Sequence, residues 1–294
     1  MNTILLIGSN GQVGTELQNI LPNTQSKIVA VARPSVDLTQ PDTLRQVIRE
    51  TQPQIIINAA AYTAVDKAES EPELVAAINT QAPGILAEES QKLGAFLIHM
   101  STDYVFDGKA YLPYQPSDPT NPLSIYGKTK LAGEDAIRAA CPHHLILRTA
   151  WVYGVHGKGN FVKTMLRLGK ERQELRVVAD QIGSPTWAGD LASAIAQLIP
   201  QLTPELAGTY HYTNSGVASW YDFAIAIFEE AQQLGFPLQL QRVIPITTPE
   251  YPTPAKRPAY SVLSCEKISA ILQTPAPHWR QSLRNMLRDL AHRT

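Results

Sequence analysis

A tyrosine and a lysine at helical spacing are the residues of this sequence best suited to proton transfer. Tyr126 and Lys130 stand four residues apart in the segment Tyr-Gly-Lys-Thr-Lys, so on a helix they would share one face, which Lys128 would not. A phenol with a pKa of about 10 exchanges protons poorly at neutral pH unless a nearby cation stabilises the phenolate. Lys130 would supply that cation and could also hold a cofactor ribose. Because this spacing is common, the pair needs support from elsewhere in the chain.

A second set of polar residues follows a short buried run. Phe96–His99 has the character of a strand, and Ser101, Thr102 and Asp103 come shortly after it. Ligands of an open parallel sheet bind at the carboxyl ends of its strands. Thr102 is therefore suited to hydrogen-bond a substrate oxygen, with Asp103 as a second polar group at the same mouth. A turn or a helix cap is the structural alternative for Ser101 and Thr102.

A glycine-rich loop at the start of the sequence indicates a nucleotide site. The run from Gly8 to Gly14, Gly-Ser-Asn-Gly-Gln-Val-Gly, follows the strand-like segment Ile4–Ile7 and precedes a helical pattern. Glycines permit a tight turn and close backbone approach, and the helix N-terminus offers N–H groups and a partial positive charge to a pyrophosphate. This context favours a dinucleotide over a purely structural turn. The expected cofactor contacts in the loop are Gly8, Asn10, Gly11, Gln12, Val13 and Gly14.

The residues after the second and third strands bear on the choice of cofactor. An acidic residue just past the second strand would hold the ribose 2′-hydroxyl of NAD, but Arg33 stands there and could pair with the 2′-phosphate of NADP. The prediction is NADPH, with NADH left open and an exposed loop arginine as the structural alternative. Asp37 and Leu38 come slightly later, where Asp37 fits an adenine-edge contact. Small side chains after the third strand would let a cofactor lie flat, namely Ala59, Ala60 and Ala61.

The first half of the chain alternates strand and helix patterns. The strand-like runs lack polar alternation, which is typical of a parallel sheet buried on both faces; they are Ile4–Ile7, Ile28–Ala32, Ile55–Asn58, Phe96–His99 and Leu145–Arg148. The helical patterns between them are Val13–Leu21, Asp42–Glu50, Glu73–Lys92 and Ile125–Ala140, and Pro83 is expected to kink or split the third. Repeated strand–helix units predict an α/β fold with a Rossmann-like, doubly wound parallel sheet.

The second half of the chain does not continue the regular alternation of strand and helix patterns. The proline-dense segment from Pro245 to Pro258 is a poor helix or strand, so it is either an ordered loop over a site or a linker. Helical patterns return at Trp220–Gln233, with Ser219 as N-cap, and at Trp279–Ala291. The simplest division is an NAD(P)-binding domain in residues 1–150, to which later segments return, and a smaller substrate-binding lobe mainly from residues 151–294.

The composition argues against several classes of protein. Lys and Arg number 25 against 26 Asp and Glu, so the chain lacks the basic excess of a nucleic-acid binder. No apolar run approaches the roughly 20 residues that cross a bilayer, and the first residues lack the basic leader of a signal peptide. The two cysteines, Cys141 and Cys265, make neither a disulfide framework nor a CxxC metal pair. We expect a cytoplasmic protein without nucleic-acid or membrane partners.

The glycine loop, the strand-end threonine and the Tyr-x-x-x-Lys pair, in this order, resemble the extended short-chain dehydrogenase/reductase family. Within it, the chain is similar to the dTDP-4-dehydrorhamnose reductases over nearly its whole length. The segments that carry the resemblance are ILLIGSNGQVG, INAAAYTAVDKAESEP, STDYVFDG, PLSIYGKTKLAGE, RTAWVYG, GNFVKTMLRL, DQIGSPT and YPTPAKRP. The resemblance implies NADPH-dependent reduction of the C4 keto group of dTDP-4-dehydro-L-rhamnose to dTDP-L-rhamnose.

The resemblance also implies a role for each matching residue. Tyr126 would protonate the C4 oxygen, Lys130 would lower the phenol pKa and bind the nicotinamide ribose, and Thr102 would hold the keto oxygen. The residues expected around the dTDP-sugar are Asp103, Tyr104, Trp151 and Arg257. An arginine fork suits a diphosphate, with a surface salt bridge as the alternative for Arg257.

Some relatives bridge a homodimer through Mg²⁺ held by acidic residues. Glu16 matches one such position, and Asp190 is the candidate for a second, although the match around residues 187–190 is incomplete. Two solvated carboxylates are the alternative interpretation.

Two other classes of function remain open at this stage, another nucleotide-sugar enzyme of the same fold and a non-catalytic subunit. A dehydratase of the same fold would carry Thr-Asp-Glu at the strand end, where this chain has Tyr104 in place of the glutamate. An epimerase or another 4-keto reductase is separated mainly by the proline-rich block. A non-catalytic subunit related to the regulatory subunit of methionine adenosyltransferase is the alternative from another class. The intact Tyr126, Lys130 and Thr102 argue for an enzyme.

Overall fold

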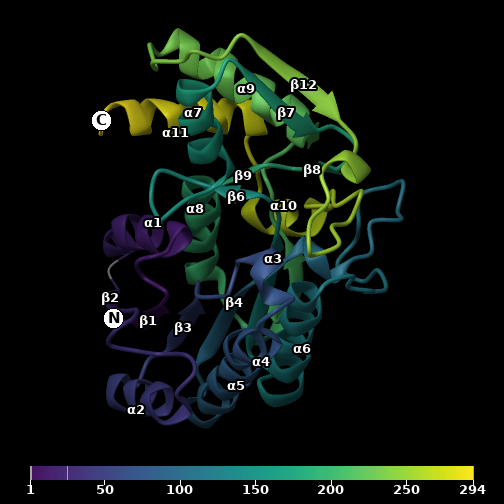
Figure 1. The fold of residues 1–294 in the computed structure, drawn as a ribbon. Coiled ribbons are helices and arrows are strands. Elements are labelled where there is room, and N and C mark those ends of the chain that lie inside the picture. The colour runs from purple at the N-terminus through teal and green to yellow at the C-terminus, as the bar shows by residue number, and fades with distance from the viewer. Residues whose placement is uncertain (1, 25, 294) are drawn as a thin grey trace.

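A six-stranded parallel sheet forms the centre of the part that contains the N-terminus (Figure 1). The computed structural model describes residues 2–24 and 26–293. The order across the sheet is β10-β5-β4-β3-β1-β2, and each neighbouring pair is parallel. The strands are β1 (Thr3–Ile7), β2 (Lys27–Val31), β3 (Ile55–Asn58), β4 (Phe96–Thr102), β5 (His144–Thr149) and β10 (Gly208–His211).

The five expected strands are confirmed, with differences at their ends. β2 begins and ends one residue earlier than expected, and β4 continues beyond His99 to Thr102, because Thr102 still pairs with Thr149 of β5. β3, β4 and β5 are buried along their whole length. Burial on both faces explains why these strands show no polar alternation.

Helices cover both faces of the sheet, which confirms the doubly wound fold (Figure 1). Alternate residues of β1 face opposite ways, with Ile4 and Leu6 in one core and Leu5 and Ile7 in the other. The first core is closed by α1 (Gln12–Ile20), α8 (Ala188–Leu198) and α10 (Glu266–Leu272). The second core is closed by α2 (Pro41–Thr51), α5 (Ala82–Leu93) and α6 (Ile125–Ala140).

The long helical stretch around Pro83 is split, as expected. It consists of α4 (Pro72–Ala76), a π-helical turn η2 (Ala77–Gln81) and α5, preceded by the short α3 (Val65–Ala68). Pro83 has no N–H to donate to the carbonyl of Asn79. That carbonyl instead packs against Gly133 of α6, where a Cβ would lie 2.2 Å from its oxygen.

A second, smaller unit has its own apolar core, at the top of Figure 1. It contains α7 (Phe161–Glu171), β7 (Glu174–Val178), α9 (Trp220–Gln233), β12 (Arg242–Ile246) and α11 (Trp279–Ala291). The helices α9 and α11 have the expected bounds, and Ser219 caps α9 in a capping box with Asp222. The sequence did not predict α7, α8, β7 or β12.

The expectation that the segment from Pro245 to Pro258 avoids regular structure is wrong at its start. Pro245 lies within β12, which pairs in parallel with β7 in a two-stranded sheet. Every strand of such a sheet is an edge strand, where a missing N–H is tolerated.

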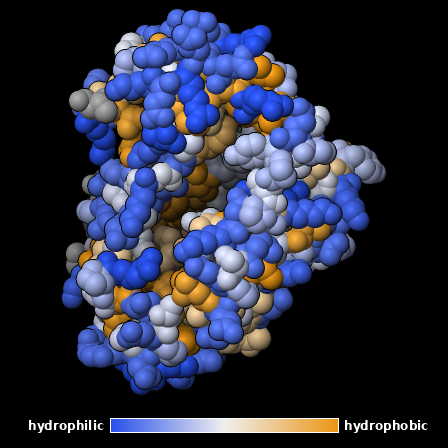
Figure 2. All heavy atoms as spheres, in the orientation of Figure 1, coloured by the Kyte–Doolittle hydropathy of each residue, from blue (hydrophilic) through white to orange (hydrophobic). Residues whose placement is uncertain are grey.

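The chain passes between the two units several times. α8, β10 and α10 come from the second half of the chain but complete the large sheet and its core. Two small pairs of strands lie along the crossings, β6 (Val152–Tyr153) with β9 (Thr186–Trp187) and β8 (Ile182–Gly183) with β11 (Ala218–Ser219). Figure 2 shows the face between the units hollowed, with apolar atoms inside the hollow. Among the described residues, no helix is both long and apolar enough to cross a bilayer.

Candidate active site

The glycine loop lies at the point where the order of strands reverses. From β1 the chain runs outward to β2 and then returns to β3 on the other side of β1, and ligands of doubly wound sheets bind at such a switch point. Gly8 has a φ of +83°, and a Cβ there would lie 2.7 Å from the backbone nitrogen of Ala60. A Cβ on Gly14 would lie 2.1 Å from the carbonyl oxygen of Gly8. Side chains are therefore excluded where the two loops meet.

The N-terminus of α1 is suited to an anion. Gly11 occupies the cap position and has no side chain with which to cap the first backbone N–H groups. Gln12, at the first helical position, instead ties the loop to the second half of the chain, because its Oε1 accepts from Nδ2 of Asn160 at 2.8 Å. Asn10 is exposed and Val13 packs against the first core. The geometry of the loop fits the predicted pyrophosphate site.

The other expected cofactor residues surround the same sheet edge. Arg33 follows β2 and is exposed, and Leu38 packs against the second core. Asp37 accepts hydrogen bonds at 2.9 Å from both N and Oγ1 of Thr39, which lower the pKa of its carboxyl. The small residues after β3 are each partly buried, namely Ala59, Ala60 and Ala61. Their contacts with a cofactor stay predictions.

The Tyr-x-x-x-Lys pair lies on α6, whose bounds are those expected. Ser124 caps the helix by accepting from the backbone nitrogen of Gly127 at 3.2 Å. Tyr126 and Lys130 are buried, with exposures of 8% and 2%, whereas Lys128 is exposed. The prediction that Tyr126 and Lys130 share a face is confirmed.

Thr102 and Asp103 form a buried hydrogen-bonded pair where β4 ends. The Oγ1 of Thr102 donates to Oδ1 of Asp103 at 2.9 Å and accepts from the backbone nitrogen of Tyr104 at 3.2 Å. Thr102 thus caps the short turn η3 (Asp103–Val105). Burial raises the pKa of Asp103 to about 6, against hydrogen bonds from Ser261 and Thr102. Its Oδ2 has no hydrogen-bond partner among the described residues.

Burial also shifts the two groups suited to proton transfer. It raises the pKa of Tyr126 to about 12, against a hydrogen bond with Thr102, and the negative charge of Asp103 adds to the increase. Burial lowers the pKa of Lys130 to about 8, against the charge of Glu134. The sequence predicts a phenol pKa lowered by Lys130. In the free chain it is raised instead, because the phenol is desolvated beside a carboxyl.

Aromatic side chains from both units extend the site. Tyr104 packs edge-on against Tyr126, with ring centroids 5.4 Å apart. Trp151 has a φ of +50° and stacks on Trp220 at 3.5 Å between centroids. A positive φ in a bulky residue is held only where its surroundings enforce it.

Arg257 joins the proline-rich segment to the first unit. Its Nη1 and Nη2 donate to the two carboxylate oxygens of Asp66 at 3.0 and 2.8 Å, and Asp66 lies on α3. The structure therefore already gives the arginine fork a carboxylate partner. The diphosphate contact stays a prediction.

The two acidic residues considered for Mg²⁺ have separate partners. Oε1 of Glu16 lies 3.8 Å from Nε2 of His156, whereas Oδ2 of Asp190 accepts from Asn214 and Ser282. In residues 2–24 and 26–293, His, Cys, Asp and Glu side chains form no cluster of three or more that could hold a metal. The metal-bridged homodimer stays a prediction.

Several side chains around Lys130 do not follow from any of the motifs. Nζ of Lys130 donates to the carbonyl of Met100 at 2.6 Å and lies 3.2 Å from Nε2 of His99. Glu134 is buried with Arg148 and Ser101. The available signal was the spacing of His99 and Ser101, since polar residues two apart on a strand face the same side.

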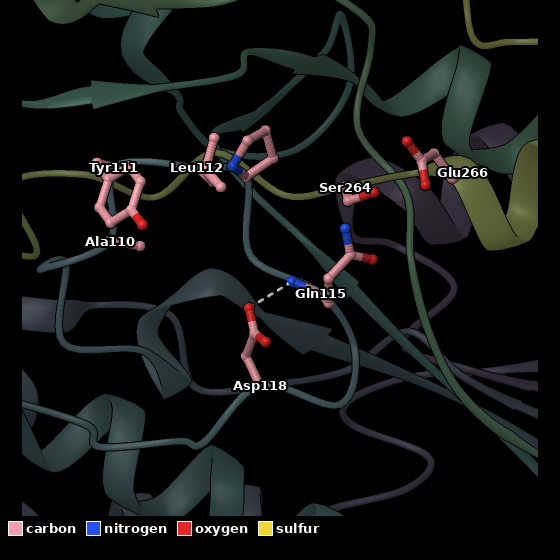
Figure 3. Close-up of a pocket in the computed structure, with 8 residues that line it drawn as sticks. Ala110, Tyr111, Leu112, Gln115, Asp118, Ser264 and Glu266 are labelled. Carbon is pink, nitrogen blue, oxygen red and sulfur yellow. Dashed lines mark hydrogen bonds between the residues drawn. The ribbon is translucent and has the colours of Figure 1, made fainter.

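A shallow pocket lies away from these residues (Figure 3). It is formed by the loop after η3 and the start of α10, and in it the backbone nitrogen of Gln115 donates to Asp118 at 2.7 Å. None of the predicted site residues lines it.

The strand order, the glycine loop at the switch point and the buried face of α6 define a Rossmann-like α/β protein. The sequence profile of the RmlD substrate binding domain matches residues 1–292. The dTDP-4-dehydrorhamnose reductase of Escherichia coli K12 is 46% identical over 293 residues, covering 98% of this chain and 97% of that protein. The chain belongs to the RmlD substrate binding domain family.

Solved structures agree with this assignment. A dTDP-4-dehydrorhamnose reductase from Clostridium acetobutylicum has a TM-score of 0.90 at 40% identity, covering 98% of this chain and 99% of that one. The dTDP-4-dehydrorhamnose reductase from Bacillus anthracis, solved in complex with NADP, has a TM-score of 0.91 at 39% identity and the same coverage.

Proposed function

We propose that this chain is a reductase that uses NADPH to convert the C4 keto group of dTDP-4-dehydro-L-rhamnose into the hydroxyl of dTDP-L-rhamnose. The observation that carries the proposal is the buried group of Thr102, Tyr126 and Lys130 at the end of β4, on the sheet whose strand β1 leads into a glycine loop that fits a dinucleotide. Membership of the family over nearly the whole chain supports it. So does the NADP complex of the relative from Bacillus anthracis.

The residues that would hold the cofactor are those of the switch point. The glycine loop and the N-terminus of α1 would bind the pyrophosphate, and Ala59–Ala61 would flank the nucleotide. Arg33 is free of the sheet core and would pair with the 2′-phosphate, which is why we propose NADPH before NADH. When bound, NADPH supplies the hydride for the carbonyl carbon, and the protein orients it.

The chain's own residues would manage the proton. A phenol whose pKa is raised to about 12 is fully protonated at neutral pH, so Tyr126 is ready to donate a proton to the carbonyl oxygen as negative charge develops there. Thr102, next to it, would hold that oxygen by a hydrogen bond. Lys130 would bind the nicotinamide ribose and, when charged, stabilise the phenolate that Tyr126 leaves.

The smaller unit and its crossings would hold the dTDP-sugar. Tyr104 and Trp151 would line the sugar, with Asp103 as a polar contact beneath it. Arg257 would exchange its partner Asp66 for the diphosphate, since both ligands offer paired oxygens to a guanidinium. A cytoplasmic location and a homodimer belong to this proposal as predictions.

The test is a turnover assay with product identification. The purified chain is mixed with NADPH and dTDP-4-dehydro-L-rhamnose, NADPH loss is followed, and the sugar nucleotide is identified by mass and NMR. We expect stoichiometric conversion to dTDP-L-rhamnose, and loss of conversion in the presence of a metal chelator would support the predicted Mg²⁺ site at Glu16. Incubation with NAD⁺ and a UDP-hexose reports epimerase activity instead. Binding of NADPH without turnover of either sugar would contradict the proposal and favour a non-catalytic subunit.

A further inference from the structure

Two buried polar side chains of the central sheet lie in a line that ends at Lys130. Asn58 of β3 and His99 of β4 are register partners in neighbouring parallel strands. Nδ2 of Asn58 lies 3.0 Å from Nδ1 of His99, and Nε2 of the same ring lies 3.2 Å from Nζ of Lys130. Both Asn58 and His99 have an exposure of 0%. Solvent therefore cannot satisfy these atoms, and their protons must be shared among themselves.

One backbone group determines which way the line is oriented. The N–H of Ala60 donates to Oδ1 of Asn58 at 3.1 Å. A backbone nitrogen can only donate, so the amide oxygen must face it, and the amide nitrogen must face His99. Nδ1 of His99 then accepts, and the proton of the neutral ring stands on Nε2. That N–H points at Nζ of Lys130, which can accept only as a neutral amine.

We infer that Asn58 and His99 form a hydrogen-bond line, anchored on the backbone of Ala60, that favours the neutral amine of Lys130 over the ammonium in the free chain and so opposes its protonation. His99 is thus a positioning residue that acts on the charge of Lys130. The amine keeps a second fixed contact, because it donates to the carbonyl of Met100 at 2.6 Å.

Charging Lys130 has a definable cost in this arrangement. An ammonium at Nζ needs a lone pair on Nε2, so the ring proton must move from Nε2 to Nδ1. The amide N–H of Asn58 would then face the N–H on Nδ1 of His99, so that two donors meet. Turning the amide of Asn58 would relieve this conflict but would leave the N–H of Ala60 without an acceptor. A buried donor without a partner is destabilising, because it has lost its hydrogen bond to water and gained none. The line therefore opposes protonation through hydrogen bonding, in addition to burial.

One other charge acts on the pKa of Lys130. Glu134, one turn further along α6, favours the ammonium, but its carboxylate is already engaged by Arg148. The titratable and charged groups that surround Lys130 on α6, β4, the turn after it and β5 are His99, Asp103, Tyr104, Tyr126, Glu134 and Arg148. Among these groups His99 alone contacts Nζ directly, so the tautomer of His99 determines whether Nζ faces a donor or an acceptor.

The consequence for catalysis rests on the proposed function, whereas the hydrogen-bond line from Asn58 through His99 to Lys130 does not. If Lys130 acts on the Tyr126 phenolate as a cation, the enzyme must charge Lys130 against this line. The pH above which activity falls, as Lys130 loses its proton, would then depend on the tautomer of His99.

The first experiment is nitrogen NMR of the free chain labelled with ¹⁵N-histidine. The spectrum of His99→Gln identifies the His99 signals by their disappearance. We expect a neutral ring with the proton on Nε2 above about pH 8, where Lys130 is the neutral amine. A ring that carries its proton on Nδ1 at that pH, or that titrates like an exposed histidine, would overturn the inference. Neither result depends on substrate or turnover.

The second experiment reverses the line with one isosteric change. In Asn58→Asp, carboxylate oxygens accept from both Ala60 and Nδ1 of His99, so Nε2 becomes the acceptor for an ammonium at Lys130. We expect the Nε2–H tautomer to be lost. We also expect titration of Lys130, followed with ¹⁵N-lysine, to move up by about one pH unit or more. In an active enzyme the alkaline limb of kcat/KM should move with it.

Asn79→Asp is the matched control. Asn79 is equally buried, but it bonds to the backbone of Tyr62 and not to His99, so the titration of Lys130 should stay unchanged. An equal shift in both variants would show a general charge effect and refute the line. Where Asn58→Asp does not fold, His99→Gln replaces it. The line would turn the amide oxygen of the glutamine towards Asn58 and its NH2 towards Nζ, so the Lys130 titration should stay unchanged, and a rise of a pH unit or more would refute the inference.

Discussion

Two successive turns of α6 each carry a buried ionisable side chain, but only one of the two side chains contacts a partner of opposite charge. Glu134 accepts from Ser101 at 2.6 Å and from Nε and Nη2 of Arg148 at 2.9 and 2.7 Å. These bonds hold the pKa of its carboxyl below its usual value in spite of burial. Lys130, one turn earlier, contacts a carbonyl and an imidazole, both uncharged, and its pKa falls to about 8.

The difference separates a structural charge from one available for chemistry. A carboxylate and a guanidinium that satisfy each other keep a constant charge over the whole physiological range. A lysine among neutral partners has a proton affinity near working pH, which is what an acid–base or switching group needs. Burial alone therefore does not mark the functional residue; burial without a counter-charge does.

The largest expected effect is the loss of activity on removal of the Tyr126 hydroxyl. Tyr126→Phe removes the proposed proton donor, so kcat should fall by about 10²–10⁴-fold with the fold retained. The measurement is steady-state NADPH consumption with the proposed sugar. Tyr114→Phe is the control, because Tyr114 is equally buried but donates to Asp107 away from the site. Equal losses in both variants would assign the effect to packing.

The next effect is on stability. Glu134→Leu leaves Arg148, which is 2% exposed, as an uncompensated buried charge. We expect a loss of about 3–5 kcal/mol in the free energy of unfolding, measured by denaturant titration. A loss below about 1 kcal/mol would mean that the ion pair does not compensate the charge as described.

Lys130→Met should increase the free energy of unfolding, whereas Glu134→Leu should decrease it. The folded chain releases the Lys130 proton at about pH 8 and the unfolded chain near pH 10.5. Below pH 8 both states are protonated and the folded chain bears the full cost of the buried charge. Between the two values the unfolded chain binds more protons, so wild-type stability rises with pH. The variant should be more stable by about 1–3 kcal/mol at pH 7, with the gain shrinking towards pH 10.5.

The pH dependence of the difference between wild type and Lys130→Met is the check. Unfolding is measured for both proteins across that range, which cancels the other titrating groups. If Lys130→Met instead lowered the free energy of unfolding at pH 7 by as much as Glu134→Leu does, the difference described between the two buried side chains would be wrong.

The smallest effect on stability is expected at the half-exposed pair of Arg257 and Asp66, with side-chain exposures of 22% and 41%. Arg257→Gln should change the free energy of unfolding by less than about 1 kcal/mol, because solvent screens the pair. If the guanidinium serves the diphosphate, KM for the dTDP-sugar should rise by about tenfold with kcat nearly unchanged. An unchanged KM would leave the arginine as a contact between the units only.

Much of the first unit follows from local pattern. Ile125–Ala140 has its bounds and its buried face because the cap at Ser124 and the four-residue spacing act within a few turns of chain. The second unit was less accessible. The helix Ala188–Leu198 was not expected, and β12 accommodates Pro245 only because it is an edge strand beside β7. Edge position is a property of the assembled sheet.

The sequence by itself determined the glycine loop, the parallel strands and the shared face of Tyr126 and Lys130, because turn geometry and side-chain periodicity are local. Only the tertiary structure decided what surrounds Lys130. Asn58 and His99 come from two separate strands, and they meet its amine through the register of a parallel sheet. Which proton each atom holds depends on these long-range contacts, since a buried hydrogen bond must be completed by whatever the fold places opposite it.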